Sequence, residues 1–348
     1  MQVLSATDAI APAMGRTRDL LFHPFRWGTY LKLCAVAVLT EGLGNFHSSN
    51  GGGTPSSSSG PTGSGVPFNF DPGMIAGLVT AGILFLILCV ALFYVVVRLR
   101  FALFHCLVHR IRELRPGWDM YREQAMRFFQ LSIMVGVGFL AVAAVALAPF
   151  VPGFLRVFRE SQAGGHLDFA DFLPLALQLV PVLLLLALAG VAVDVVLRDF
   201  MLPHMALENA SAGEAWTSVL DRIADQKGAF FVYALLRVLL PFAAAILLFI
   251  ALAIPSLMLF GIPGVLIALL HAAQVHSTGA AWMAVVLLEV VLGIFLVALG
   301  LLMAVCFGGP VSIALRNYAL LFYGGRYQLL GNLLAPPQTA YAAPPLPA

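Results

Sequence analysis

The sequence predicts an all-α fold, a polytopic transmembrane helix bundle with six spans and amphipathic helices on its cytoplasmic side. Three observations lead to it: long apolar stretches, a shortage of charge, and positive charges gathered in alternate connections. Of the 348 residues, 61% are hydrophobic and 10% are charged, whereas soluble domains carry roughly 25% charged residues. A soluble chain needs a charged surface, so lipid is the expected solvent for most of this one.

The apolar stretches match the length that a membrane requires, because a helix needs roughly 20 apolar residues to cross the hydrocarbon of a bilayer. The first stretch is the weakest, since it carries Lys32 and Glu41. The six stretches cover residues 27–46, 74–97, 128–150, 173–197, 229–254 and 280–306.

A further apolar segment, 255–275, follows the fifth stretch and is interrupted by Pro255, Gly261, Pro263 and Gly264. Breaks in the backbone at membrane depth need protein or water partners. We interpret this segment as a re-entrant or interfacial piece in preference to a seventh span.

Positive charges give the orientation. Fifteen lysines and arginines fall in the connections on one side of the spans, against Arg156 and Arg159 on the other. Cytoplasmic connections are enriched in these residues, so we expect a multi-pass protein of the bacterial inner membrane with both termini in the cytoplasm. The fifteen are Arg16, Arg18, Arg26, Arg98, Arg100, Arg110, Arg112, Arg115, Arg122, Arg127, Arg198, Arg222, Lys227, Arg316 and Arg326.

The predicted organisation is a cytoplasmic segment 1–26, a transmembrane domain 27–334 and a disordered Pro/Ala tail 335–348. The outer loop 47–65 is rich in Gly and Ser and has no charge, so it cannot bury enough surface to offset its ordering entropy and is expected to be a flexible tether.

A short amphipathic helix is predicted before the fifth stretch. Ser211 followed three residues later by Glu214 is a capping-box signature, and Trp216, Val219 and Leu220 then recur at helical spacing. This helix is expected at the inner membrane surface, packed on the ends of the spans. Binding of a protein partner or of lipid headgroups is the alternative.

The segment FALFHCLVHRIRELRPGW (101–118) resembles FMLPHMALENASAGEAW (200–216), with one residue of offset. Each follows one span and precedes the next, as in parallel repeats. The sixth stretch, the tail, the N-terminal segment and the first stretch would form a third, circularly split unit. Coincidence in a low-complexity apolar sequence is the competing explanation.

Three segments resemble a large prokaryotic group of uncharacterised six-span membrane proteins, some similar to the membrane domain attached to certain glycerophosphoryl diester phosphodiesterases. They are TRDLLFHPFRWGTYLKL (17–33), RDFMLPHMALENASAGEAW (198–216) and LRNYALLFYGGRY (315–327). The resemblance implies a six-span architecture. It carries over no phosphodiesterase activity, because no soluble enzyme domain accompanies these segments.

Catalytic and metal-binding motifs are sparse. His105 and His109 have the i, i+4 spacing that places two ligands on one metal, but without an acidic neighbour they are better explained as surface histidines. The sequence has no nucleophile elbow, phosphate-binding loop or zinc-protease motif. We therefore expect no catalytic residues, no metal, no cofactor and no nucleic-acid partner.

Ionisable residues inside the spans are costly in lipid unless they are paired or hydrated. Arg237 lies deep in the fifth stretch, Glu289 is comparably deep in the sixth, and Asp194 is near the inner end of the fourth. We expect Arg237 to pair with Glu289 or Asp194 and to face away from lipid. A structural ion pair is favoured over a proton or ion relay.

Tryptophans near the ends of spans are expected to act as interfacial anchors, here Trp27, Trp118 and Trp216. Together the features predict a non-catalytic scaffold or regulatory membrane component. Its partners would be the lipid bilayer and a protein at the cytoplasmic face. The alternative is a small-solute or ion transporter with a polar site near Arg237 and Glu289.

Overall fold

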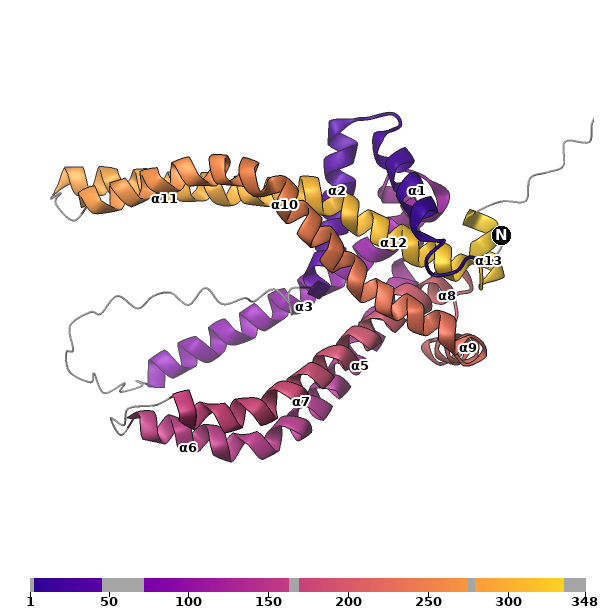
Figure 1. The fold of residues 1–348 in the computed structure, drawn as a ribbon, viewed down its shortest axis with the longest axis horizontal. Helices are drawn as coiled ribbons and strands as arrows, with labels where there is room; N and C mark the ends of the chain where they lie inside the picture. The colour runs from indigo at the N-terminus through magenta and orange to yellow at the C-terminus, as the bar shows by residue number, and fades with distance from the viewer. Residues whose placement is uncertain (1–2, 46–71, 163–168, 275–278, 335–348) are drawn as a thin grey trace, which may run out of the picture. The chain divides into compact units, whose positions relative to one another are not determined.

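The computed structural model describes residues 3–45, 72–162, 169–274 and 279–334 (Figure 1). Within these ranges the chain consists of helices joined by short turns, without any strand. The all-α prediction is therefore confirmed there. The expected tether 47–65 and tail 335–348 lie outside the described residues.

The chain divides into two compact units, and the first comprises residues 1–16, 121–243 and 314–348. In it α5, α6 and α7 are neighbouring helices (Figure 1). Its elements are the start of α1 (Ile10–Phe22), α5 (Arg122–Leu147), the 3-10 turn η1 (Ala148–Phe150), α6 (Val151–Gln162), α7 (Phe169–Val195), the π-helical η2 (Val196–Met201), α8 (Leu202–Leu207), α9 (Ala212–Asp225), the start of α10 (Lys227–Gln274), the end of α12 (Gly309–Gly324) and α13 (Gln328–Leu334).

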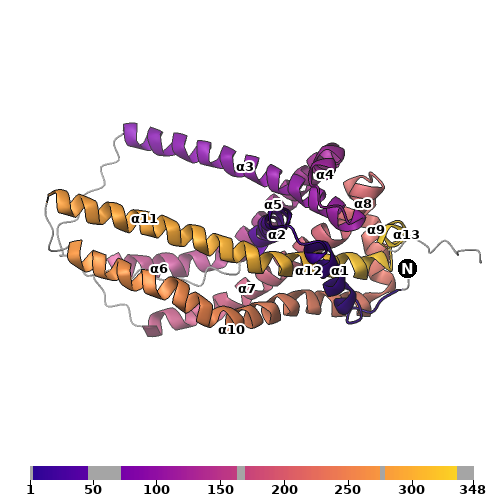
Figure 2. The ribbon, with the colours of Figure 1, turned by 90° about the horizontal axis from the view of Figure 1, so that it is seen from above.

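The second unit comprises residues 17–120 and 244–313. In it α11 runs beside the later part of α10 as a hairpin (Figure 2). Its other elements are α2 (Trp27–Asn45), α3 (Pro72–His109), α4 (Arg115–Met120), α11 (Ala280–Met303), the π-helical η3 (Ala304–Gly308) and the first residues of α12.

Five helical segments are long and apolar enough to cross a membrane, and they correspond to the second to sixth expected stretches. The chain is therefore a multi-pass membrane protein. The first stretch forms α2, a helix of 19 residues that is not among the five. The count of six remains a prediction. The five segments are Ala76–His109, Arg122–Arg156, Leu173–Leu207, Lys227–Ala272 and Trp282–Gly324.

The expectation that residues 255–275 form a re-entrant or interfacial piece is wrong. Residues 255–274 continue α10, which runs unbroken for 48 residues, Pro255 and Pro263 included. In lipid an interrupted backbone leaves polar groups without partners, so a helix accommodates a proline more cheaply than a loop does. At 1.5 Å per residue the helix is about 72 Å long, more than twice the hydrocarbon thickness of about 30 Å.

Burial separates each candidate span into two parts. The most apolar windows of the spans are at most 6% buried, and large side chains such as Leu86 and Phe249 are 63% and 76% exposed. Buried residues instead gather in segments 96–108, 197–206 and 313–323. Exposed apolar helix surface is what lipid covers, whereas the buried segments are covered by protein.

In the second unit α2 packs closely against the region where η3 becomes α12. Leu33, Cys34 and Ala37 of α2 are at most 1% exposed, and the Tyr30 hydroxyl donates a hydrogen bond to the carbonyl oxygen of Cys306 at 2.6 Å. Gly309 permits this approach, because a Cβ there would lie 2.7 Å from the Cα of Cys34.

We expect Gly309→Ala to reduce stability by about 1–3 kcal/mol, the usual cost of overpacking, since the clash is with backbone. The measurement is the thermal midpoint of the detergent-purified protein. Gly293→Ala is the control, because a Cβ at Gly293 meets nothing within 4 Å. Equal midpoints for both variants would show that the close packing of α2 is not as described.

Candidate functional site

A buried carboxylate, that of Asp199, forms the centre of the candidate site in the first unit. Asp199 lies in η2, where five consecutive residues, Leu197 to Met201, are all buried. Five consecutive helical residues cover every face of a helix, so protein surrounds η2 on all sides. π-Helical turns occur frequently at functional positions.

Each oxygen of Asp199 faces an arginine. The Tyr233 hydroxyl and Nε of Arg237 donate to Oδ2 at 2.7 and 3.0 Å. A guanidinium nitrogen of Arg316 donates to Oδ1 at 3.0 Å. The side chains of Asp199, Arg316 and Arg237 are only 0%, 3% and 9% exposed. This group of Asp199, Tyr233, Arg237 and Arg316 is called the Asp199 cluster below.

The Asp199 cluster joins parts of the chain that are far apart in sequence. Its residues come from η2, from the start of α10 and from the end of α12. A buried carboxylate is tolerated only when counter-charges and hydrogen-bond donors compensate for lost hydration. The cluster thus fixes three helices in one register.

Aromatic rings surround the cluster. Tyr233 stacks on Phe322 with ring centroids 4.4 Å apart and on Tyr318 at 5.3 Å. Phe200 lies 5.0 Å from Tyr323 and 5.2 Å from Phe230. Aromatic pairs at such distances add about 0.5–1.5 kcal/mol beyond area burial, so the rings both exclude water and hold the helices.

A second polar group centres on His204, which is 1% exposed. Nδ1 of His204 lies 3.0 Å from a carboxylate oxygen of Glu208. Nε2 lies 2.8 Å from the Tyr323 hydroxyl and 3.0 Å from a guanidinium nitrogen of Arg222. These distances fit an imidazole that donates from Nδ1 to Glu208 and accepts at Nε2. Burial opposes ionisation of Glu208, but the His204 hydrogen bond and the Arg222 charge leave its pKa below the usual value.

The first and last described segments are attached to the same unit by arginines. Arg16 donates to the carbonyl oxygen of Leu334 at 3.3 Å. Arg326 donates to the carbonyl oxygen of Leu4 at 3.1 Å and to Gln226 at 2.8 Å, and its guanidinium lies 3.9 Å above the Phe322 ring. Helix α1 and the chain after α12 are thereby joined.

The residues expected to form an intramembrane ion pair have the following partners. Arg237 pairs with Asp199, where we expected Glu289 or Asp194. Asp194 accepts a hydrogen bond from Arg198 one turn later, and Glu289 lies 3.5 Å from His271. Asp199 was overlooked because it follows the apolar stretch 173–197 and looks like a loop residue.

A recurring pattern could have identified Asp199. Arg198 and Arg316 each precede an aromatic residue by two positions, Phe200 and Tyr318, and both aromatics are 2% exposed. An arginine at this spacing before a buried aromatic marks the segments that protein covers.

The three tryptophans predicted as interfacial anchors differ in environment. Trp27 is 63% and Trp216 44% exposed. Trp118 is half-buried beneath Arg98, whose guanidinium lies 4.0 Å from its ring. The interfacial role stays a prediction for all three.

The predicted capping box of α9 is confirmed. The Ser211 hydroxyl accepts from the Glu214 amide, and the Glu214 carboxylate accepts from the Ser211 amide at 2.8 Å. Ala215 and Val219 are buried on one face of α9, whereas Trp216 and Leu220 are 44% and 42% exposed. The helix packs on the unit with one face and offers apolar groups on the other.

His105 and His109 stack with ring centroids 4.3 Å apart. His109 is exposed, as expected of a surface histidine, but His105 is only 6% exposed, so that expectation is wrong for His105. In the described part of the chain no three His, Cys, Asp or Glu side chains are grouped so that they could hold a metal ion.

A model of a family of unknown function, DUF7544, matches residues 4–333. No curated protein and no solved structure matches the chain. The resemblance to membrane domains attached to phosphodiesterases therefore stays a prediction.

Replacing Asp199 with Asn should destabilise the protein by about 3 kcal/mol or more, because it removes the anion that faces two buried guanidinium groups. The thermal midpoint of the detergent-purified protein is the measurement. Asp221→Asn, on the exposed side of α9, should leave the midpoint nearly unchanged. If the two variants melted together, the Asp199 cluster would not hold the helices in register.

The capping box makes α9 sensitive to acid. Its backbone and side-chain hydrogen bonds with Ser211 lower the pKa of Glu214 below 4.5. The contribution is complete above the unfolded pKa and is lost as pH falls through the folded one. Hydrogen exchange of the α9 amides should accelerate below about pH 4. Ser211→Ala, costing about 1 kcal/mol, should accelerate it at neutral pH. Unchanged exchange would contradict the capping role.

Proposed function

We propose that this chain, which belongs to the family of unknown function DUF7544, is a non-catalytic scaffold or regulatory component of a membrane. The observation that carries the proposal is the closure of the Asp199 cluster. A catalytic acid or base must come within hydrogen-bond reach of its substrate. Here Asp199, Tyr233 and Arg316 are at most 3% exposed and bind one another, so these groups serve to hold helices together.

The proposed setting is the bacterial inner membrane, with six spans and both termini in the cytoplasm. The buried ends of the spans support it, because they alternate along the chain: the C-terminal end of α3, the N-terminal end of α5, η2 after the C-terminal end of α7, and the N-terminal end of α10. Antiparallel spans place such ends on one side. Ten of the cations belong to these ends and the connections between them, and five more precede α2 or follow α11, against two in the opposite connections.

Helix α2 is the proposed sixth span. Its 19 residues suffice to cross the hydrocarbon. It is less apolar than the others because one face is buried against protein at Leu33, Cys34 and Ala37, and a helix with one face covered needs fewer lipid-facing groups. Counting α2 as a span also keeps Arg16, Arg18 and Arg26 on the arginine-rich side.

The proposed partner surface is the exposed side of α9, where Trp216 and Leu220 are adjacent at i, i+4. Tryptophan is enriched where proteins bind one another. A protein at the cytoplasmic face is the partner that this surface fits, since the opposite face of α9 is already packed.

A transporter remains the second candidate, favoured by one observation. Glu289 in α11 lies 3.5 Å from His271 in α10, so two titratable groups meet between candidate spans. A proton or ion pathway would use such a pair.

Reconstituted liposomes separate the two candidates. We expect the purified protein to give no proton or ion flux above that of empty liposomes, because the Asp199 cluster is closed and the Glu289–His271 pair alone is not a pathway. A photo-crosslinking amino acid at Leu220 should give a defined adduct in native membranes, while the same group at Phe154, in α6, should give none. Flux that Glu289→Gln abolishes would establish the transporter and overturn the scaffold.

A further inference from the structure

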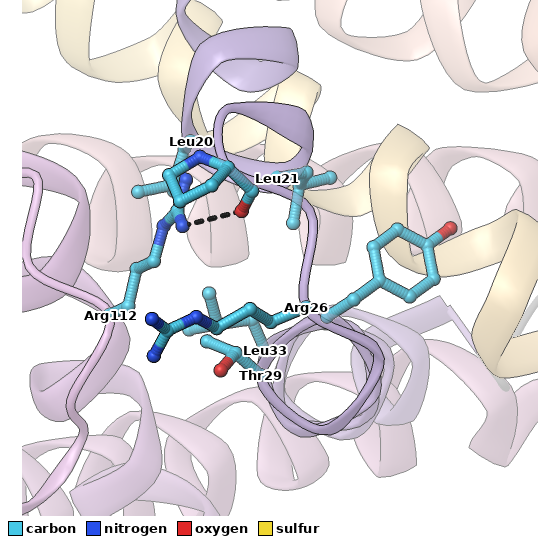
Figure 3. Close-up of a pocket in the computed structure, with 8 residues that line it drawn as sticks. Leu20, Leu21, Arg26, Thr29, Leu33 and Arg112 are labelled. Carbon is cyan, nitrogen blue, oxygen red and sulfur yellow. Dashed lines mark hydrogen bonds between the residues drawn. The ribbon is translucent and has the colours of Figure 1, made fainter.

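A small hollow lies in the second unit, where the end of α1 and the start of α2 approach the turn after α3. It is shallow and open to solvent, and its interior leaves no room for a water-sized sphere, so a ligand would contact it only at its rim. Figure 3 shows the Arg26 guanidinium extending across the hollow toward Arg112, with Leu20, Leu21 and Leu33 along its walls. Two cations and the Thr29 side chain thus share a small depression with three leucines.

The two arginines are held differently. Arg112 donates to the carbonyl oxygens of Pro24 at 2.7 Å and of Asp19 at 3.3 Å, and also to that of His23. It therefore caps the C-terminal end of α1, where a cation is favourable. The Arg26 guanidinium, by contrast, has no hydrogen bond or ion pair with any described residue, although the Arg26 carbonyl oxygen accepts from the Tyr30 amide at 2.9 Å. Its charge is open to an external anion.

Aromatic side chains stand beside the hollow. Phe22, Phe25 and Trp27 are 43%, 44% and 63% exposed, yet they contact one another, with Phe25 6.0 Å from Phe22 and 5.3 Å from Trp27. Exposed aromatic groups next to arginine are typical of the membrane–water interface, where one end of the group is apolar and the other wet.

The size of the hollow limits what it can hold. Pockets that enclose a whole small molecule have volumes of roughly 300–1,000 Å³, whereas this hollow has no interior room for one. A ligand would therefore meet the exposed Arg26 guanidinium at the surface of the hollow. An arginine without a protein partner favours phosphate, which guanidinium binds in a forked geometry. The neighbouring aromatics favour a ligand whose remainder is apolar.

We propose that the exposed Arg26 guanidinium, at the rim of the hollow, binds the phosphate of an anionic phospholipid. Arg26 is the direct contact, Arg112 adds positive charge from its fixed position, and the acyl chains lie along Phe25 and Trp27. The orientation proposed above determines only that the cytoplasmic leaflet supplies the lipid; binding itself does not depend on it.

The test uses the delipidated full chain in neutral detergent, titrated with phosphatidylglycerol or phosphatidylcholine, with bound lipid counted by native mass spectrometry. We expect phosphatidylglycerol to bind more tightly than phosphatidylcholine. Arg26→Gln should weaken phosphatidylglycerol binding about fivefold, the scale on which one arginine attracts an anionic lipid. Arg26 is exposed, so the variant should fold, as its thermal midpoint will show.

Arg122→Gln is the matched control, since Arg122 is an exposed arginine of the same arginine-rich side at the start of α5. It loses the same charge and should retain full lipid binding. Equal losses in both variants would show diffuse attraction and overturn the site. Inorganic phosphate that displaces phosphatidylglycerol at comparable concentrations, in an Arg26-dependent way, would identify a free-phosphate site and overturn the lipid assignment. Flux through liposomes would contradict the scaffold without touching this result.

Discussion

The contact between Asp199 and its two arginines is the constraint on which the first unit depends. A carboxylate with no solvent exposure is stable only with counter-charges at hydrogen-bond distance, and here these come from α10 and α12. Neither helix can slide along or rotate about its axis without exposing a buried charge to apolar neighbours. The aromatic rings around Tyr233 then pack against helices whose register the ion pairs define.

Lipid covers some parts of this chain, and protein covers others. Over the apolar windows of the spans the side chains remain uncovered by protein, and there lipid supplies the contacts. The segments rich in arginine, tyrosine and histidine are buried instead. Because a single continuous helix has one part covered by lipid and another part covered by protein, such helices are about twice as long as a bilayer is thick.

The sequence predicted those features of the structure that depend on residues close together in the chain. The helical class, the five strongest apolar stretches and the capping box at Ser211 and Glu214 all depend on residues close in sequence, and they were recognised. Asp199 was missed because its role depends on Arg316, which lies 117 residues away. The unbroken course of α10 was missed because Pro255 and Pro263 break helices in water more readily than in lipid.

Arg16 and Arg326 join the first and last described segments by hydrogen bonds, and these contacts bear on how the gene could have arisen. They are what the expected third repeat unit requires, because that unit would use α13 and α1 as the connection between its spans. Tyr318 and Leu320 of α12 repeat the buried aromatic–x–leucine pattern of Phe200 and Leu202. A gene assembled by triplication and then opened within one copy would leave this trace.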